Sequence, residues 1–251
     1  MNLRDFENCI IELFGQDKLD LVKDNGEFGF THKGKEDVLK VGYCTNLTIE
    51  TAKKAVENKV DLILTHHDAW EWMVGFKEKC LNILRENQIS HYYIHLPLDD
   101  AEFGNNVAIL DKLGFTVIDK FSLEDGMYCG RVGRIDEAIT LEELVASTES
   151  LLEEKVKCWK NNEKPIEKIG VVTGAGFSAI TIKEASELGC DVYLTGEKIL
   201  YTVEYAEFAG INLIVGSHTF TEIFGVEKLA SLIKEKFSDI EIIQIQESHI
   251  E

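Results

Sequence analysis

Histidines and carboxylates follow three separate apolar segments of the sequence, and these side chains are the ones that bind divalent transition metals. His66 and His67 end the segment DLILTHH, and His218 lies four residues before Glu222. Neighbouring residues point in divergent directions, so the histidine pair could serve two adjacent ions. His95 and Asp99 repeat the four-residue spacing. The three segments together predict a metal site built from imidazoles and carboxylates.

Each segment also has a structural interpretation when it is taken alone. His66 and His67 could cap a strand and bond a loop, and His218 and Glu222 could be an exposed helix start. Pro97 favours a turn rather than a helix between His95 and Asp99. Three such coincidences are improbable, which favours the metal site. Imidazole with carboxylate suits zinc, manganese, iron or nickel, and the absence of nearby cysteines argues against a thiolate site.

The elements that must position these residues alternate between apolar strands and amphipathic helices, which is typical of α/β proteins. Open α/β sheets bind ligands at the carboxyl ends of their strands, where these side chains fall. Thr140 with Glu143, and Thr181 with Glu184, match the capping box that starts a helix. The predicted strands are Leu39–Cys44, Val60–Thr65, Tyr92–Leu96, Thr116–Phe121, Lys168–Val172, Asp191–Thr195, Asn212–Val215 and Glu241–Ile245.

An internal repeat relates the two halves of the chain. Residues 40–67 and 168–197 share a strand, turn, helix and strand, with Asp61 matching Asp191. The His66-His67 pair takes the place of Gly196-Glu197, and the later His95 and Asp99 correspond to His218 and Glu222. We therefore expect two repeat-related lobes, residues 1–125 and 126–251, that meet near Asp125-Gly126.

Two further features are expected to have structural roles. The segment GAGFS (residues 174–178) is a partial phosphate-loop pattern, and a tight strand-to-helix turn is the favoured interpretation. His32, His91 and His249 have no ligand partner at a suitable spacing. We interpret His91 as a strand-entry residue and His249 as part of a tail.

Composition limits the partners and the compartment. The 251 residues carry 45 acidic and 26 basic side chains, a formal charge of -19, which disfavours nucleic acid and anionic membranes without excluding a local basic lining. The amino-terminal segment resembles an amphipathic helix rather than a signal peptide, and no stretch has membrane-spanning length. The six cysteines form no CxxC pair. This pattern favours reduced thiols and a cytoplasmic location.

With these motifs in place, the chain resembles the GTP cyclohydrolase 1 type 2 homologues, also called NIF-three-like proteins. The shared elements are DLILTHH, HLPLDD with GNN, GRVGRI, DVYLTGE and GSHTFTE, which span most of the sequence. The resemblance implies two intertwined α/β lobes with mixed sheets and the short form that lacks an inserted domain. It also implies a ring-shaped homohexamer. This sequence has Thr45-Asn46 where an acidic residue often follows the first strand.

The resemblance implies a dinuclear centre whose metal ligands are His66, His67, Asp99, His218 and Glu222. Two such ions would make hydrolysis of a nucleotide or phosphoester the leading activity. Glu197 or His95 would then move protons, although His95 could instead orient Asp99. The competing functions are a metal-handling or partner-binding ring without catalysis and, less favoured by charge, a ring that encircles nucleic acid.

Overall fold

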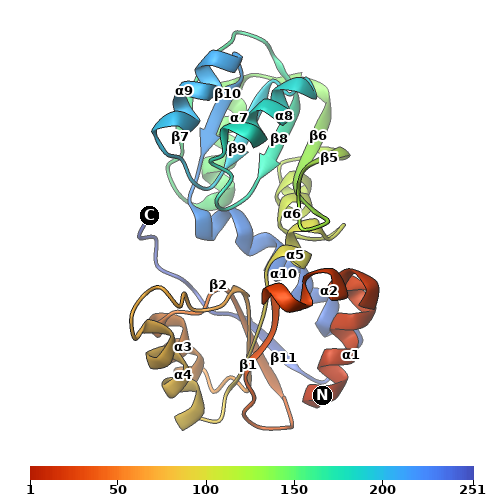
Figure 1. Cartoon of the computed structure of the whole chain (residues 1–251), viewed down its shortest axis with the longest axis vertical. Coiled ribbons are helices and arrows are strands. Elements are labelled where there is room, and N and C mark those ends of the chain that lie inside the picture. The colour runs from red at the N-terminus through yellow and green to blue at the C-terminus, as the bar shows by residue number, and fades with distance from the viewer. The chain divides into compact units, whose positions relative to one another are not determined.

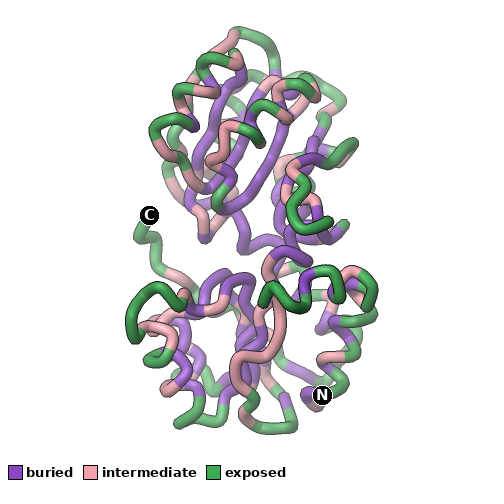
Figure 2. Tube along the Cα trace, in the orientation of Figure 1, coloured by how far each residue is buried: buried purple, intermediate pink, exposed green.

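The computed structural model describes residues 1–251, which form two compact units. The first unit contains residues 1–101 and 226–248, and the second contains residues 102–225 and 249–251. In both units the central strands are buried and the exposed residues gather on helices and loops (Figure 2). The chain thus crosses from one unit to the other three times.

The first unit is built on a mixed five-stranded sheet in the order β1-β4-β3-β2-β11 (Figure 1). The strands span β1 (Phe28–His32), β2 (Lys40–Asn46), β3 (Leu62–His67), β4 (Ser90–Ile94) and β11 (Glu241–Gln244). β1 is antiparallel to β4 at one edge, and the other neighbours are parallel. Because β2, β3 and β4 run in one direction, their carboxyl ends lie at the same edge of the sheet.

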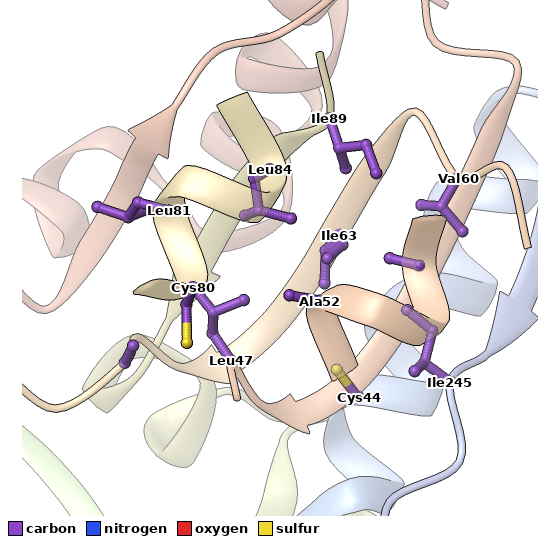
Figure 3. Close-up of a cluster of buried hydrophobic side chains, with 12 residues drawn as sticks. Cys44, Leu47, Ala52, Val60, Ile63, Cys80, Leu81, Leu84, Ile89 and Ile245 are labelled. Carbon is purple, nitrogen blue, oxygen red and sulfur yellow. The ribbon is translucent and has the colours of Figure 1, made fainter. Parts of the chain in front are cut away.

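Helices cover both faces of this sheet. Its helices are α1 (Leu3–Phe14), α2 (Gln16–Val22), a 3₁₀ turn at Lys23–Asn25, α3 (Ile49–Glu57), α4 (Phe76–Glu86), α5 (Leu96–Asp100) and the second half of α10 (His218–Lys236). On one face, Leu84 of α4 and Ala52 of α3 pack against Ile63 (Figure 3). On the other face, Phe6 of α1 packs edge-on against Tyr92. Burying each large aliphatic side chain contributes about 1.5–3 kcal/mol.

The second unit contains a mixed six-stranded sheet in the order β5-β6-β8-β9-β10-β7. The strands span β5 (Thr116–Glu124), β6 (Met127–Ile139), β7 (Lys157–Trp159), β8 (Ile166–Val172), β9 (Val192–Thr195) and β10 (Asn212–Val215). The central β8, β9 and β10 are parallel, whereas β5, β6 and β7 pair antiparallel. The two mixed sheets and their helices confirm the predicted α/β class.

The helices of the second unit are α6 (Asn105–Lys112), α7 (Leu141–Leu152), α8 (Ala179–Glu187), α9 (Leu200–Ala209) and the first half of α10. Ile182 of α8 and Ala206 of α9 share a buried cluster with Tyr193 of β9. The Tyr193 hydroxyl donates to the Gly176 carbonyl at 2.7 Å, so this fully buried polar atom is satisfied.

The repeat is visible as two equivalent strand-helix-strand segments, β2-α3-β3 and β8-α8-β9. Asp61 Oδ2 accepts hydrogen bonds from the backbone N–H groups of residues 39 and 40. Asp191 Oδ2 makes the same pair of bonds to residues 167 and 168. The matching aspartates therefore have one role, which is to tie the start of the second strand to the start of the first.

Some local predictions differ from the structure. The division into units does not fall at residues 125–126, which instead form the turn of the β5-β6 hairpin inside the second unit. The Thr140-Glu143 capping box is confirmed at α7. The proposed box at Thr181 is wrong, because α8 begins earlier and Ser178 is its N-cap. No helix combines the length and the apolar content that a membrane crossing requires.

Candidate metal centre

His66 and His67 are the last two residues of β3, at the carboxyl edge of the first sheet. Both side chains are buried, with exposed fractions of 0% and 8%. His66 Nδ1 donates to the Ile94 carbonyl at 3.0 Å, and His67 Nδ1 donates to Asn46 Oδ1 at 2.8 Å. These bonds fix the tautomer of both rings, so Nε2 is the nitrogen that can coordinate an ion.

His95 brings a third imidazole to the same place. Its ring lies 4.8 Å from that of His66 and 5.2 Å from that of His67, measured between centroids. His95 Nδ1 donates to Glu27 Oε2 at 2.6 Å, and this bond lowers the pKa of Glu27. The three histidines offer ligand atoms within 4.8 Å of one another, a spacing that suits a shared cation.

Asp99 lies beside this cluster on α5. Its Oδ1 is 3.6 Å from His66 Nε2, so an ion bound by that nitrogen would also be within reach of the carboxylate. The expected turn around Pro97 is wrong, because residues 96–100 form a short helix. Proline is accommodated there because it occupies the first helical turn, where its missing N–H has no acceptor to lose.

Asn46 and Glu247 support His67, and the sequence motifs did not identify either residue. Asn46 Oδ1 accepts from His67, while Asn46 Nδ2 donates to Glu247 Oε1 at 2.8 Å. The same carboxylate accepts from the backbone N–H groups of Thr45 and Asn46. Burial raises the pKa of Glu247 to about 7, although these hydrogen bonds oppose the rise. Glu247 thus supplies a carboxyl group beside Thr45 and Asn46, at the end of β2.

In the second unit, His218 is the first residue of α10, which follows β10, and Glu222 lies one turn further along the helix. His218 Nε2 is 3.3 Å from Glu222 Oε2, which confirms that the four-residue spacing puts both on one helix face. Glu197 follows β9 and accepts a hydrogen bond from His218 Nδ1 at 2.7 Å. Glu197 is therefore placed to orient His218, in addition to its expected role in moving protons.

The electrostatics of His218 favour a positive charge. Burial lowers the pKa of His218, but the carboxylates of Glu222 and Glu197 outweigh it and raise the pKa to about 11. A site that holds a proton this firmly between two carboxylates would also attract a divalent cation.

Two glycines make room for this pair. Gly174 begins the GAGFS segment with a φ of +61°, and a Cβ there would lie 2.8 Å from His218 Nε2 and overlap Glu222 Oε1. A Cβ at Gly196 would come within 2.7 Å of His218 Cα. Ser178 then caps α8. The segment is a tight strand-to-helix turn, as expected, and its close approach to His218 explains the first glycine.

The other histidines lie outside these groups. His91, the second residue of β4, is buried between the hydroxyls of Thr31 and Thr65. His249 is exposed and stacks on Phe220, with ring centroids 3.7 Å apart. Their placement agrees with structural rather than metal-binding roles.

The chain therefore contains clustered imidazoles and carboxylates that could hold a metal ion. The first unit groups His66, His67, His95 and Asp99, and the second groups Glu197, His218 and Glu222. Imidazole nitrogens with tautomers fixed by hydrogen bonds, together with carboxylate oxygens, fit a cation such as Zn²⁺, Mn²⁺ or Fe²⁺. None of the six cysteines is placed among them.

Comparison with known proteins identifies relatives of this chain and of its fold. The GTP cyclohydrolase 1 type 2 homolog of Pyrococcus horikoshii is 33% identical over 221 residues, covering 85% of this chain and 87% of that protein. Reduced HcgD from Methanocaldococcus jannaschii is 28% identical with a TM-score of 0.80, over 98% of both chains. The protein ybgI, of unknown function, shares the fold with a TM-score of 0.87 and 24% identity over 99% of both chains. The model of the Duf34/NIF3 (NGG1p interacting factor 3) family matches residues 1–250, and the chain belongs to that family.

Proposed function

We propose that the chain binds two divalent metal ions and acts as a metal-dependent hydrolase on a nucleotide or phosphoester. The proposed ligands are His66, His67, Asp99, His218 and Glu222. The observation that carries the proposal is the group of imidazoles at the ends of β3 and β4, whose Nδ1 atoms are all held by oxygen acceptors. This arrangement directs the Nε2 atoms to coordination.

Two divalent ions, when bound, would acidify a water molecule and stabilise negative charge on a phosphate oxygen. The residues of the chain have two tasks in such a reaction. His66 and His67 hold their rings in fixed orientations, so little side-chain entropy is lost when they bind. A carboxylate or imidazole of the chain must accept a proton, and Glu197 and His95 are the candidates.

The test of the metal site is the metal content of the purified protein after it has been loaded with zinc, manganese or iron. We expect about two ions per chain. Replacing both His66 and His67 with alanine should remove nearly all of the metal, because those ligands come from one strand end. The matched control is the double replacement of His32 and His249, which should retain it. Full occupancy in the His66/His67 variant would contradict the ligand assignment.

The test of the hydrolase is Glu197→Gln, assayed against a panel of nucleotides and phosphoesters. If Glu197 moves protons, this variant keeps its metal and loses at least about tenfold in turnover. If Glu197 only orients His218, metal affinity falls instead, because glutamine cannot match the carboxylate as an acceptor. A wild-type protein that hydrolyses nothing above its metal-free background would favour the metal-handling or partner-binding alternative.

Assembly and location complete the proposal. The family resemblance supports a homohexameric ring, which light scattering would test as a mass near six chains. A monomer at micromolar concentration would contradict it. No cysteine forms a disulfide and four of the six are buried, which supports a reducing, cytoplasmic location.

A further inference from the structure

We propose that the loop of residues 68–75, between β3 and α4, binds the base of a nucleotide by stacking it on Trp70 and Trp72. We call residues 68–75 the tryptophan loop. The inference rests on the proposed function, because it names the part of the substrate that this loop would recognise.

The tryptophan loop begins immediately after the histidine pair. The Trp70 ring lies 6.1 Å from the His67 ring, measured between centroids, at an interplanar angle of 37°. The Trp72 ring lies 6.3 Å from the Trp70 ring at 43°. A row of three aromatic rings thus leads from a proposed metal ligand to the surface. A ligand whose phosphate lay near His67 could place an attached planar ring against the tryptophans.

The loop exposes more apolar surface than folding explains. Trp72 is 78% exposed, Met73 41% and Val74 101%. Three consecutive apolar side chains in solvent bury little on folding, and such contiguous exposure is typical of a binding surface. Aromatic side chains bind nucleobases of any sequence because every base offers a π-face.

Hydrogen bonds and ion pairs hold the backbone of the tryptophan loop in place. The Met73 N–H donates to the Trp70 carbonyl at 3.3 Å, and the Phe76 N–H donates to the Met73 carbonyl at 2.8 Å. Lys77 of α4 pairs with Asp68 at 2.7 Å and with Glu71 at 2.6 Å, so it ties the loop at two points. The loop is therefore ordered before a ligand binds, so little conformational entropy is lost on binding.

The charges of the loop favour binding of the base of a nucleotide rather than of its phosphate. Its only acidic residues are Asp68 and Glu71, and the neighbouring cation, Lys77, is paired with both. The loop itself contains no lysine or arginine. It therefore offers no cation to a phosphate, whereas its aromatic faces suit an uncharged heteroaromatic ring.

The protein has three tryptophans, Trp70, Trp72 and Trp159, so fluorescence can isolate the loop. In a Trp159→Phe background all tryptophan emission comes from Trp70 and Trp72. The experiment titrates this protein with guanosine, adenosine and ribose 5-phosphate, with metal and after chelation. We expect both nucleosides to quench the emission in both states and ribose 5-phosphate to leave it unchanged. Trp72→Ala should weaken nucleoside binding, followed by calorimetry, by about 5- to 150-fold.

Two control variants make the result specific. Trp72→Phe keeps a stacking face and should retain most of the affinity, whereas Leu200→Ala removes an exposed apolar side chain from the second unit and should change nothing. Nucleoside binding that Trp72→Ala leaves intact, or an absence of quenching, would overturn the inference. So would a change of oligomeric mass in Trp72→Ala, because the loop would then be an interface between copies of the chain.

The outcomes also separate this inference from the proposed function. Nucleoside binding after the metal has been removed by a chelator would support base stacking on the tryptophan loop even if no substrate were hydrolysed. The opposite result is also possible: the wild type and Trp72→Ala could hydrolyse a phosphoester at the same metal-dependent rate while neither binds nucleosides. That result would overturn base stacking on the tryptophan loop and leave the proposed hydrolase activity intact.

Discussion

The three clustered imidazoles differ in what their Nδ1 atoms contact: a backbone carbonyl for His66, a side-chain amide for His67 and a carboxylate for His95. A carboxylate partner increases the basicity of the opposite nitrogen more than a neutral acceptor does. His95 is therefore the most electron-rich of the three rings. Its bond to Glu27 leaves Nε2 as the nitrogen that can bind an ion.

The support of His67 can be tested at Asn46. Replacing Asn46 with alanine removes the acceptor of the His67 Nδ1 hydrogen bond and leaves the ring free to turn or to change tautomer. We expect the metal affinity to fall by about 10- to 100-fold, as measured by competition with a chelating dye. Asn87→Ala is the matched control, because the Asn87 side chain bonds only the end of its own helix. Equal affinities in the two variants would show that Asn46 does not position His67.

His91 gives a prediction about pH. Thr65 Oγ1 donates to the His67 carbonyl, so it accepts from His91 Nε2, and His91 Nδ1 accepts from Thr31. The ring is therefore neutral, and burial lowers its pKa from 6.5 to about 3. In the unfolded chain it would take up a proton near pH 6.5. Its stabilising contribution is complete above that pH and is lost as the pH falls from 6.5 towards 3.

Below pH 6.5 we expect the free energy of unfolding to fall with pH more steeply in the wild type than in His91→Gln. The difference in slope should be up to about 1.4 kcal/mol per pH unit. Glutamine can still bond both threonines but does not titrate. Chemical denaturation in the presence of a chelator, from pH 7.5 to 4.5, would measure this. The exposed His249→Gln is the control and should follow the wild type. Parallel curves for wild type and His91→Gln would contradict the prediction.

The sequence indicated the candidate ligands but not the residues that hold them. His67 contacts an asparagine 21 positions away, and that asparagine contacts a glutamate 201 positions away. No local spacing connects such residues, because only the packing of β2 beside β3 and of the segment after β11 beside β2 brings them together. The candidate ligands could be proposed from the sequence because His66 and His67 end an apolar strand and His218 closely follows another.

At the scale of elements, the parallel strands were predictable and the antiparallel ones often were not. β2, β3, β4, β8, β9 and β10 are short apolar runs buried on both faces, which is the pattern of a parallel sheet. The predictions missed β1, β6 and β7. β6 contains two glycines and two arginines, and β7 has only three residues at a sheet edge, so neither has a clear apolar period.

The turn between β8 and α8 gives a prediction at this scale. Gly174→Ala adds a methyl group at a φ of +61° where Glu222 and His218 already lie. We expect it to displace that pair and to lower the metal content, besides a backbone cost of about 1 kcal/mol. Metal analysis and thermal unfolding would measure the two effects.

Gly210→Ala is the matched control for Gly174→Ala. Gly210 has a similar φ of +66°, but no atom lies within 4 Å of the added carbon. It should show the loss of stability and keep its metal. If both variants bound metal like the wild type, the close approach at Gly174 would have no part in the site.

At the scale of the molecule, the two units are interleaved in sequence. All strands of the second unit fall within residues 116–215, whereas the first unit needs β11 at residues 241–244 to complete its sheet. The resemblance implied intertwined lobes, but a single boundary near residue 125 could not represent a chain that crosses between units three times. The first two crossings leave no local signal, because one lies directly after α5 and the other within α10 rather than in a linker.

This path predicts an order of folding. The β11-β2 pair closes a loop of most of the chain, and such distant pairings form slowly. We expect pulsed hydrogen exchange during refolding to show protection in β8, β9 and β10 before β2 and β11. Simultaneous protection of both sheets would show that the two units fold as one cooperative body.

During synthesis, one edge of β2 stays unpaired until β11 is made. β2 leaves the ribosome almost 200 residues before β11, so one edge of the nascent sheet has unpaired backbone groups for most of translation. At roughly 5–20 residues per second, that interval lasts on the order of 10–40 s. An exposed parallel edge is a template for pairing with another nascent chain. Until β11 is made and pairs with β2, this edge needs a protection from other chains that the completed sheet does not require.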